Sequence, residues 1–197
     1  MRSRKSRVLL SLALLTVSIG FFAVAGSVAF QRGGNGAGPG NGAGGALVPL
    51  NDAEKATLVF MREEEKLARD VYITMFEKWD DKIFSNISAA EQRHMDAILV
   101  QLVKYGVPDP AAGLEIGSFK NADLQKAFDE LVAQGEMSLA DALRVGRLIE
   151  EMDIEDLLAA IDETSKTDLD RVYGNLLKAS YAHLKAFTVH PACSIKQ

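Results

Sequence analysis

The 197-residue chain carries 22 Lys and Arg against 27 Asp and Glu, and 48% of its residues are apolar. Residues 1–46 contain five of these bases and none of the acids, which leaves residues 47–197 with a formal charge of −10. This acidity argues against non-specific nucleic-acid binding, so we expect no nucleic-acid partner. The single cysteine, Cys193, excludes an internal disulfide framework and a cysteine-based zinc cluster.

The first 31 residues have the layout of an export signal. Four basic residues lie between Arg2 and Arg7, and no charge follows from Val8 to Phe30. This is typical of a secretory signal peptide, although an apolar run of this length also suffices for an N-terminal membrane anchor. In both cases the basic flank predicts that the acidic part is exported and becomes periplasmic, secreted or anchored. Any membrane contact is expected only through this segment, if it stays uncleaved.

Residues 32–46 hold eight of the sixteen glycines, so we interpret them as a flexible linker. One folded domain is predicted for residues 47–188, since a segment of this length can bury a sizeable core. Residues 189–197 are predicted to be a C-terminal tail.

Apolar residues recur at helical spacing in four long stretches of this domain, and there is no convincing alternation of period two. The predicted helices are about 52–79, 82–105, 138–163 and 167–187. The second has two alternative starts, because Ser88 and Glu91 have the spacing of a capping box that would begin it late. Phe84 and Ile87 continue the apolar stripe upstream, so we place its start earlier.

A long connection separates the second and third helices. Gly106 and two nearby prolines stop the second helix, and the turn-rich residues 106–120 lead into a shorter helix at 121–134, ended by Gly135. Four long helices with one long connection in the middle predict an all-α four-helix bundle with a crossover, which is the connectivity of ferritin-like folds.

Each long helix places at least one metal-competent side chain within its apolar stripe. In chain order these residues are Glu65, Glu91 with His94, Glu150, and His183 with Ser180. A buried unpaired carboxylate is costly, so several of them converging on one core require a cation. Oxygen and imidazole ligands without thiolate suit iron or manganese, with zinc as an alternative.

Each of these residues also has a simpler interpretation. Glu65 has the spacing to pair with Arg69, and Glu64 lies only one residue off the same stripe. Glu91 alone fits a capping role, and a single inward histidine is more often a packed core residue than a ligand. Glu150 competes with Glu151 and Asp153 in a run of acids that is mostly a solvated face. The prediction of a metal site therefore depends on the conjunction of one such position on every helix.

Four segments resemble the bacterial and archaeal ferritin-like family known as domain of unknown function 2202. They are Glu65–Tyr72 (EKLARDVY), Ser88–Asp96 (SAAEQRHMD), Gly146–Ile154 (GRLIEEMDI) and Asn175–Phe187 (NLLKASYAHLKAF). The resemblance covers about residues 52–188. More distantly, Glu-x-x-Ala-Arg-x-x-Tyr resembles the rubrerythrin pattern, in which that Glu ligates iron, and this favours Glu65 over Glu64.

The resemblance implies Glu65, Glu91, His94, Glu150 and His183 as metal ligands. One departure is Ser180, which stands where a full di-iron protein has the second glutamate of Glu-x-x-His. Asp153, one turn beyond Glu150, could supply a substitute carboxylate. Otherwise the site would hold one metal, bind two weakly, or lack redox chemistry.

These observations lead to three functional hypotheses for an exported domain with metal ions as partners. The first is an oxidoreductase whose di-iron, mononuclear iron or manganese centre reacts with oxygen or peroxide, with Tyr72 and Tyr181 near the ligands as hydrogen-bond donors or packed core residues. The second is a metal-handling module without turnover. The third is a structural bundle whose inward acids pair with arginines. A homodimer is compatible with all three.

Overall fold

The computed structural model describes residues 47–193, in which five α-helices and one short 3-10 helix form. The elements are α2 (Asp52–Trp79), α3 (Lys82–Tyr105), α4 (Ala122–Gly135), α5 (Leu139–Glu163), α6 (Thr167–Val189) and η1 (Pro191–Cys193). No strand occurs among these residues, so the all-α prediction is confirmed. The predicted leader (1–31), the glycine-rich linker (32–46) and residues 194–197 lie outside the described residues.

Local capping explains where the long helices begin and end. Asn51 caps α2 in a capping box, in which its side chain accepts a hydrogen bond from the Glu54 amide while Glu54 accepts one from Asn51. Asp81 caps α3, so this helix begins at Lys82 and not at the alternative capping box further on. Ser138 caps α5 as predicted. Gly106 ends α3 with φ 65°, a left-handed conformation that glycine adopts without strain.

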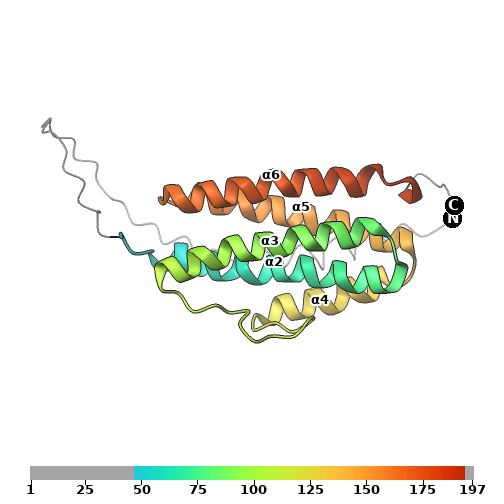
Figure 1. Ribbon diagram of the computed structural model, residues 1–197, viewed down its shortest axis with the longest axis horizontal. Helices are drawn as coiled ribbons and strands as arrows, with labels where there is room; N and C mark the ends of the chain where they lie inside the picture. Colours follow the sequence, from blue (N-terminus) through green and yellow to red (C-terminus); the bar gives the residue numbers. More distant parts are fainter. Residues whose placement is uncertain (1–46, 194–197) are drawn as a thin grey trace, which may run out of the picture. The chain divides into compact units, whose positions relative to one another are not determined.

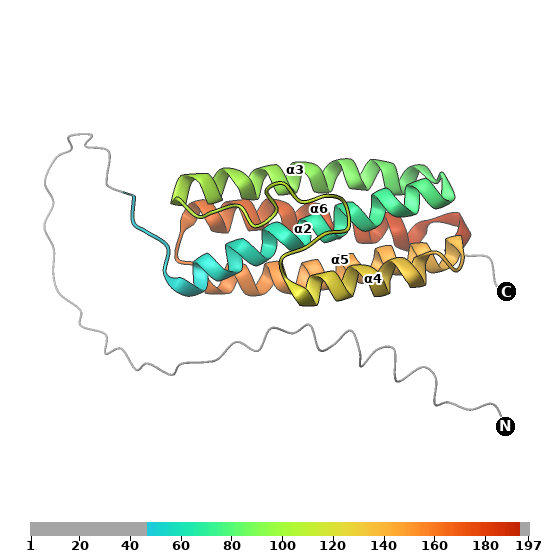
Figure 2. The ribbon, with the colours of Figure 1, turned by 90° about the horizontal axis from the view of Figure 1, so that it is seen from below.

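The four long helices pack as two antiparallel hairpins, α2 with α3 and α5 with α6 (Figure 1). The hairpins meet where α2 packs on α5 and α3 packs on α6. The short helix α4 lies outside this group of four, against α2 and α5, as Figure 2 shows. The crossover and its extra helix are therefore present as predicted. Within residues 47–193 no helix combines the length and the apolarity needed to span a bilayer.

An aromatic cluster fills the core where the two hairpins meet. The ring centroids of Tyr72 and Phe187 lie 5.2 Å apart, and those of Phe84 and Phe187 lie 5.8 Å apart. Gly146 allows this packing, because a Cβ atom at that position would lie 2.5 Å from the Phe187 ring. A residue without a side chain is thus required for α5 to approach α6 this closely.

The predicted tail begins inside the last helix, since α6 continues to Val189. His190 follows it, and its Nε2 atom lies 3.1 Å from Oδ2 of Asp81 in the turn between α2 and α3. This contact ties the end of the second hairpin to the tip of the first.

Candidate metal centre

The five residues that interrupt the apolar stripes come together inside the bundle. Glu65 lies on α2, Glu91 and His94 on α3, Glu150 on α5 and His183 on α6. The three carboxylates are only 1–2% exposed. Because each residue occupies the inward face of its helix, the packing of the two hairpins brings them together without any loop.

The first group of potential ligands, which we call the first triad, joins the two helices of one hairpin. It consists of Glu65, Glu91 and His94, whose ligand atoms all lie within 4.8 Å of one another. The Nδ1 atom of His94 is 2.7 Å from Glu91 Oε2 and 3.2 Å from Glu65 Oε2.

The second triad spans both hairpins and shares one residue with the first. It consists of Glu91, Glu150 and His183, again with ligand atoms within 4.8 Å of one another. The Nδ1 atom of His183 is 2.9 Å from Glu91 Oε1 and 3.5 Å from Glu150 Oε2. Glu91 therefore turns one carboxylate oxygen toward each histidine. The rings of His94 and His183 stack with centroids 5.7 Å apart.

Several buried atoms of the triads lack a hydrogen-bond partner. Oε1 of Glu65 has none, and Oε1 of Glu91 and Nδ1 of His183 face each other as an ion pair at 2.9 Å without the geometry of a hydrogen bond. Buried polar groups in folded proteins are nearly always satisfied, so unsatisfied atoms need an explanation. The ligand atoms of each triad lie within 4.8 Å of one another, so a cation placed among them would contact these atoms.

The carboxylates of the triads have opposite pKa shifts. Burial raises the pKa of Glu65 to about 7 although His94 lies beside it, and burial likewise raises that of Glu150 to about 7 despite His183. Burial acts on Glu91 in the same direction, but the two histidines outweigh it and lower its pKa to about 2. Glu91 is thus the carboxylate that stays ionised.

The histidines are held in their protonated form when no metal is bound. Burial lowers the pKa of His94, but Glu65 and Glu91 outweigh it and raise the value to about 11. Burial also lowers the pKa of His183, and Glu150 and Glu91 raise it to about 9. Protons therefore supply the positive charge that the buried carboxylates require, and a metal ion would have to displace them.

Tyr72 supports the second triad from the core. Its hydroxyl donates a 2.7 Å hydrogen bond to Glu150 Oε1, and the residue is fully buried. Tyr181 differs, because its side chain is 51% exposed and makes no hydrogen bond to the ligands. Of the two tyrosines considered from the sequence, only Tyr72 therefore contacts the site.

Asp153 lies close to the triads but belongs to neither of them. The Ser180 hydroxyl donates to its Oδ2 atom, and Oδ1 is buried without a partner. Burial together with Glu65 and Glu150 raises the pKa of Asp153 well above its ordinary value. The serine that replaces the expected glutamate is thus hydrogen-bonded to the substitute carboxylate predicted from the sequence.

The sequence left two choices between neighbouring acids open as ligands, and the structure answers them differently. Glu151 is exposed whereas Glu150 is buried, so only Glu150 faces the site. Glu64 is buried like Glu65, and burial together with Asp156 and Asp153 raises its pKa well above the ordinary value. Sequence reasoning missed the pairing of Glu64 with Asp156, because periodicity assigns only one buried face to α2.

Three of the four arginines that could have neutralised the inward acids bind elsewhere, and the fourth, Arg147, has a buried Nε atom without a hydrogen-bond partner. Arg69 pairs with Asp70 at 2.6 Å, and Arg144 pairs with Asp141. Arg93 donates to the carbonyl of Ala89 on its own helix. The charged partners of Glu65, Glu91 and Glu150 in the described part of the chain are histidines.

Comparison with known proteins places the chain in a family whose function is not established. Residues 54–191 match an uncharacterized protein domain, DUF2202. The uncharacterized protein MJ0754 of Methanocaldococcus jannaschii is 48% identical over 139 residues, which are 71% of this chain and 75% of that protein.

Solved structures agree with this assignment. The crystal structure of the hypothetical protein MJ0754 matches with a TM-score of 0.71 at 46% identity, over 72% of this chain and 81% of that one. A DUF305 fragment from Deinococcus radiodurans matches with a TM-score of 0.53 at 15% identity, over 71% and 95%, and is similar in fold alone. The protein whose buried carboxylates and histidines are described above belongs to the DUF2202 family.

Proposed function

We propose that the bundle is an exported, ferritin-like metal-binding protein that holds two iron or manganese ions. The observation that carries this proposal is the position of Glu91, which belongs to both triads and turns one oxygen toward each histidine. A carboxylate shared in this way is suited to bridge two cations, with Glu65 and His94 completing one site and Glu150 and His183 completing the other.

The residues fit such ions in charge and in donor type. Three carboxylates and two imidazoles supply oxygen and nitrogen donors without thiolate, a set that suits iron and manganese. Two divalent cations would offset the three negative charges of these carboxylates with one positive charge in excess, which the nearby Asp153 would offset, and would satisfy Oε1 of Glu65. When bound, these metals would supply the electrons for a reaction with oxygen or peroxide. The chain itself orients Glu150 through Tyr72 and keeps bulk water away by burial.

A metal-handling role without turnover is the second candidate. It is favoured by Ser180, which replaces a carboxylate of a full di-iron set and engages Asp153 outside the triads. With fewer charged ligands, one or both ions would be held less tightly and exchanged more readily. This role needs the same site but no reaction with peroxide.

Metal analysis tests the site itself. The full chain, produced with iron and manganese supplied, is expected to carry two metal ions, and Glu91→Gln is expected to reduce the content to less than one. Glu151→Gln is the matched control, because it changes an exposed glutamate next to Glu150 and should retain both ions. Less than one ion in the wild type, unchanged by Glu91→Gln, would rule out the proposal.

Peroxide addition then separates the two roles. An oxidoreductase loaded with iron should change its absorption spectrum and consume peroxide, while the Glu91→Gln variant should do neither. A metal-replete wild type with no spectral response would leave only the metal-handling role.

A further inference from the structure

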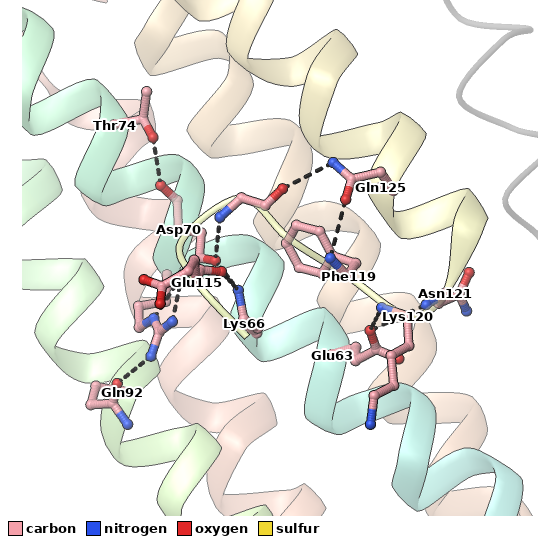
Figure 3. Close-up of polar contacts among 12 residues, drawn as sticks. Glu63, Lys66, Asp70, Thr74, Gln92, Glu115, Phe119, Lys120, Asn121 and Gln125 are labelled. Carbon is pink, nitrogen blue, oxygen red and sulfur yellow. Dashed lines mark hydrogen bonds and ion pairs between the residues drawn. The ribbon is translucent and has the colours of Figure 1, made fainter. Parts of the chain in front are cut away.

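A second buried polar network joins α2 to the crossover, and Asp70 is its centre (Figure 3). Asp70 is completely buried. Its Oδ2 atom accepts hydrogen bonds from Lys66 Nζ and, at 2.9 Å, from the Gly117 amide. Its Oδ1 atom accepts two from Arg69, at 2.6 and 2.8 Å.

This network fastens the crossover to α2. We call residues 106–121 the strap. Lys66 donates at 2.8 Å to the carbonyl of Glu115, and Glu63 accepts at 2.6 Å from the Lys120 amide. Arg62 forms a two-pronged ion pair with Asp109, with both bonds at 3.0 Å. The strap is therefore held to successive turns of α2 by charged groups, and not by apolar packing alone.

The same network also sets the position of α2 against α3. Arg69, held by Asp70, donates a 2.6 Å hydrogen bond to the side chain of Gln92 on α3. Gln92 directly follows Glu91, and Arg69 lies one turn after Glu65. A continuous series of bonds thus runs from the strap through Asp70 and Arg69 to α3, level with the first triad.

Two of the three residues of the second triad lie outside the reach of this network. Glu150 and His183 lie on α5 and α6, and none of the hydrogen bonds described for Asp70, Arg69 and Gln92 reaches those helices. Changes in this network should therefore alter the distance between Glu65 and Glu91 more than the distance between Glu91 and Glu150.

We propose that Asp70 is a positioning residue for the first triad: by holding Arg69 against Gln92 and the strap against α2, it fixes Glu65 relative to Glu91 and His94. This inference rests on the proposed metal-binding function. It assigns to the crossover the role of aligning one of the two metal sites. The first triad then depends on the crossover for its geometry, whereas the second triad does not.

The test is a titration of the full metal-free chain with Co²⁺, read by calorimetry and by the visible absorption of the bound ion. The wild type is expected to bind two ions. In Asp70→Asn one binding step should weaken by about tenfold or more, the usual effect of losing a group that orients a ligand, while the other changes little. Gln92→Ala, which removes the half-buried link between Arg69 and α3 together with an exposed hydrogen bond to Asp96, should act in the same direction if Asp70→Asn does not fold.

Two variants, each with one triad disrupted, identify the site at which metal binding weakens. His183→Ala leaves only the first triad intact, and there Asp70→Asn should retain its full effect. His94→Ala leaves only the second triad, and there the effect should vanish. Asp168→Asn is the matched control, because it removes an ion pair with Lys104 about four helical turns from His183 and should change neither step.

The outcomes are distinct. Equal weakening of both sites, or unchanged binding in both Asp70→Asn and Gln92→Ala, would overturn the positioning role while leaving the proposed function intact. A wild type that binds no Co²⁺ would overturn the proposed function and this inference together.

Discussion

The two buried polar clusters on α2 differ in how their charges are compensated. On the outer side, both oxygens of Asp70 accept hydrogen bonds from basic side chains, and Lys66 is bound at its charged end. On the inner side, Oε1 of Glu65 has no hydrogen-bond partner, and the charged partners of Glu65 and Glu91 are two histidines, whose raised pKa values keep them protonated. Burial of charge therefore does not distinguish the two clusters, whereas the pairing of their carboxylates does.

The difference has a physical cause. A fully paired cluster gains nothing from an added cation, and breaking it leaves an uncompensated charge in the core. An incompletely paired cluster is unfavourable by itself but gains free energy when a metal ion binds. The outer cluster should thus determine the stability of the metal-free protein. The inner cluster should determine how much stability a bound metal ion adds.

Among single substitutions, the largest expected effect is the loss of the outer cluster. Asp70→Ala leaves Lys66 and Arg69 without their buried partner and should lower the free energy of unfolding by about 3–5 kcal/mol. Urea denaturation of the metal-free protein measures this loss. Glu130→Ala, which breaks an exposed pair with Lys126 on α4, should cost about 0.5 kcal/mol or less. Similar losses in the two variants would contradict the contrast between the clusters.

Metal addition should act through the inner cluster alone. At a free Mn²⁺ concentration one hundred times its Kd, each bound ion should raise the free energy of unfolding by about 2.7 kcal/mol. Urea denaturation with and without Mn²⁺ measures the gain. It should be lost in Glu91→Gln and kept in Glu151→Gln, and a wild type that gains nothing would count against a metal role for the inner cluster.

Metal affinity should rise with pH. His183 and His94 hold their protons up to about pH 9 and 11, and a cation reaches either ring nitrogen only after the proton leaves. From pH 7 to 9 each displaced proton should therefore raise the apparent affinity about tenfold per pH unit. Below about pH 7, Glu65 and Glu150 also take up protons, so the decrease in affinity should become steeper.

Calorimetry in buffers with different ionisation enthalpies counts the protons released on binding. Release of protons is expected across pH 7 to 9. Constant affinity over this range would show that the histidines are not the groups that the metal displaces.

The smallest expected effect distinguishes the two triads. Tyr72→Phe removes the hydrogen bond to Glu150 without changing the packing of the ring, and should cost about 1 kcal/mol of stability. It should weaken binding at the second triad and leave the first unchanged, the reverse of Asp70→Asn. The Co²⁺ titration in the His94→Ala and His183→Ala backgrounds measures both, and weakening of the first triad would disprove the assignment.

The sequence predicts much of this fold because its signals are local. Asn51 and Ser138 mark helix starts, and Gly106 marks an end, through contacts within one helical turn. The positions of the triad residues within apolar stripes could be predicted for a related reason, although periodicity left open the choice between Glu64 and Glu65 and the resemblance to the family favoured Glu65. Their convergence then follows from the packing of amphipathic helices.

What periodicity missed is the second buried face of α2. Lys66 and Asp70 lie on the polar side of the helix, which is normally solvated, and the strap covers them through contacts 47 residues or more along the chain. Glu64 is buried, a result that periodicity did not predict. The partner of Asp153 was also beyond local reasoning, because its bond to Ser180 joins two helices.

The placement of the two triads has a consequence for the order of folding. The first triad lies within a single hairpin of neighbouring helices, whose contacts are short-range and form quickly. The second triad exists only after the two hairpins have docked, since Glu91 belongs to one and Glu150 and His183 to the other. An ion in the second triad should therefore act as a cross-link between hairpins and slow unfolding, while an ion in the first should leave the unfolding rate nearly unchanged.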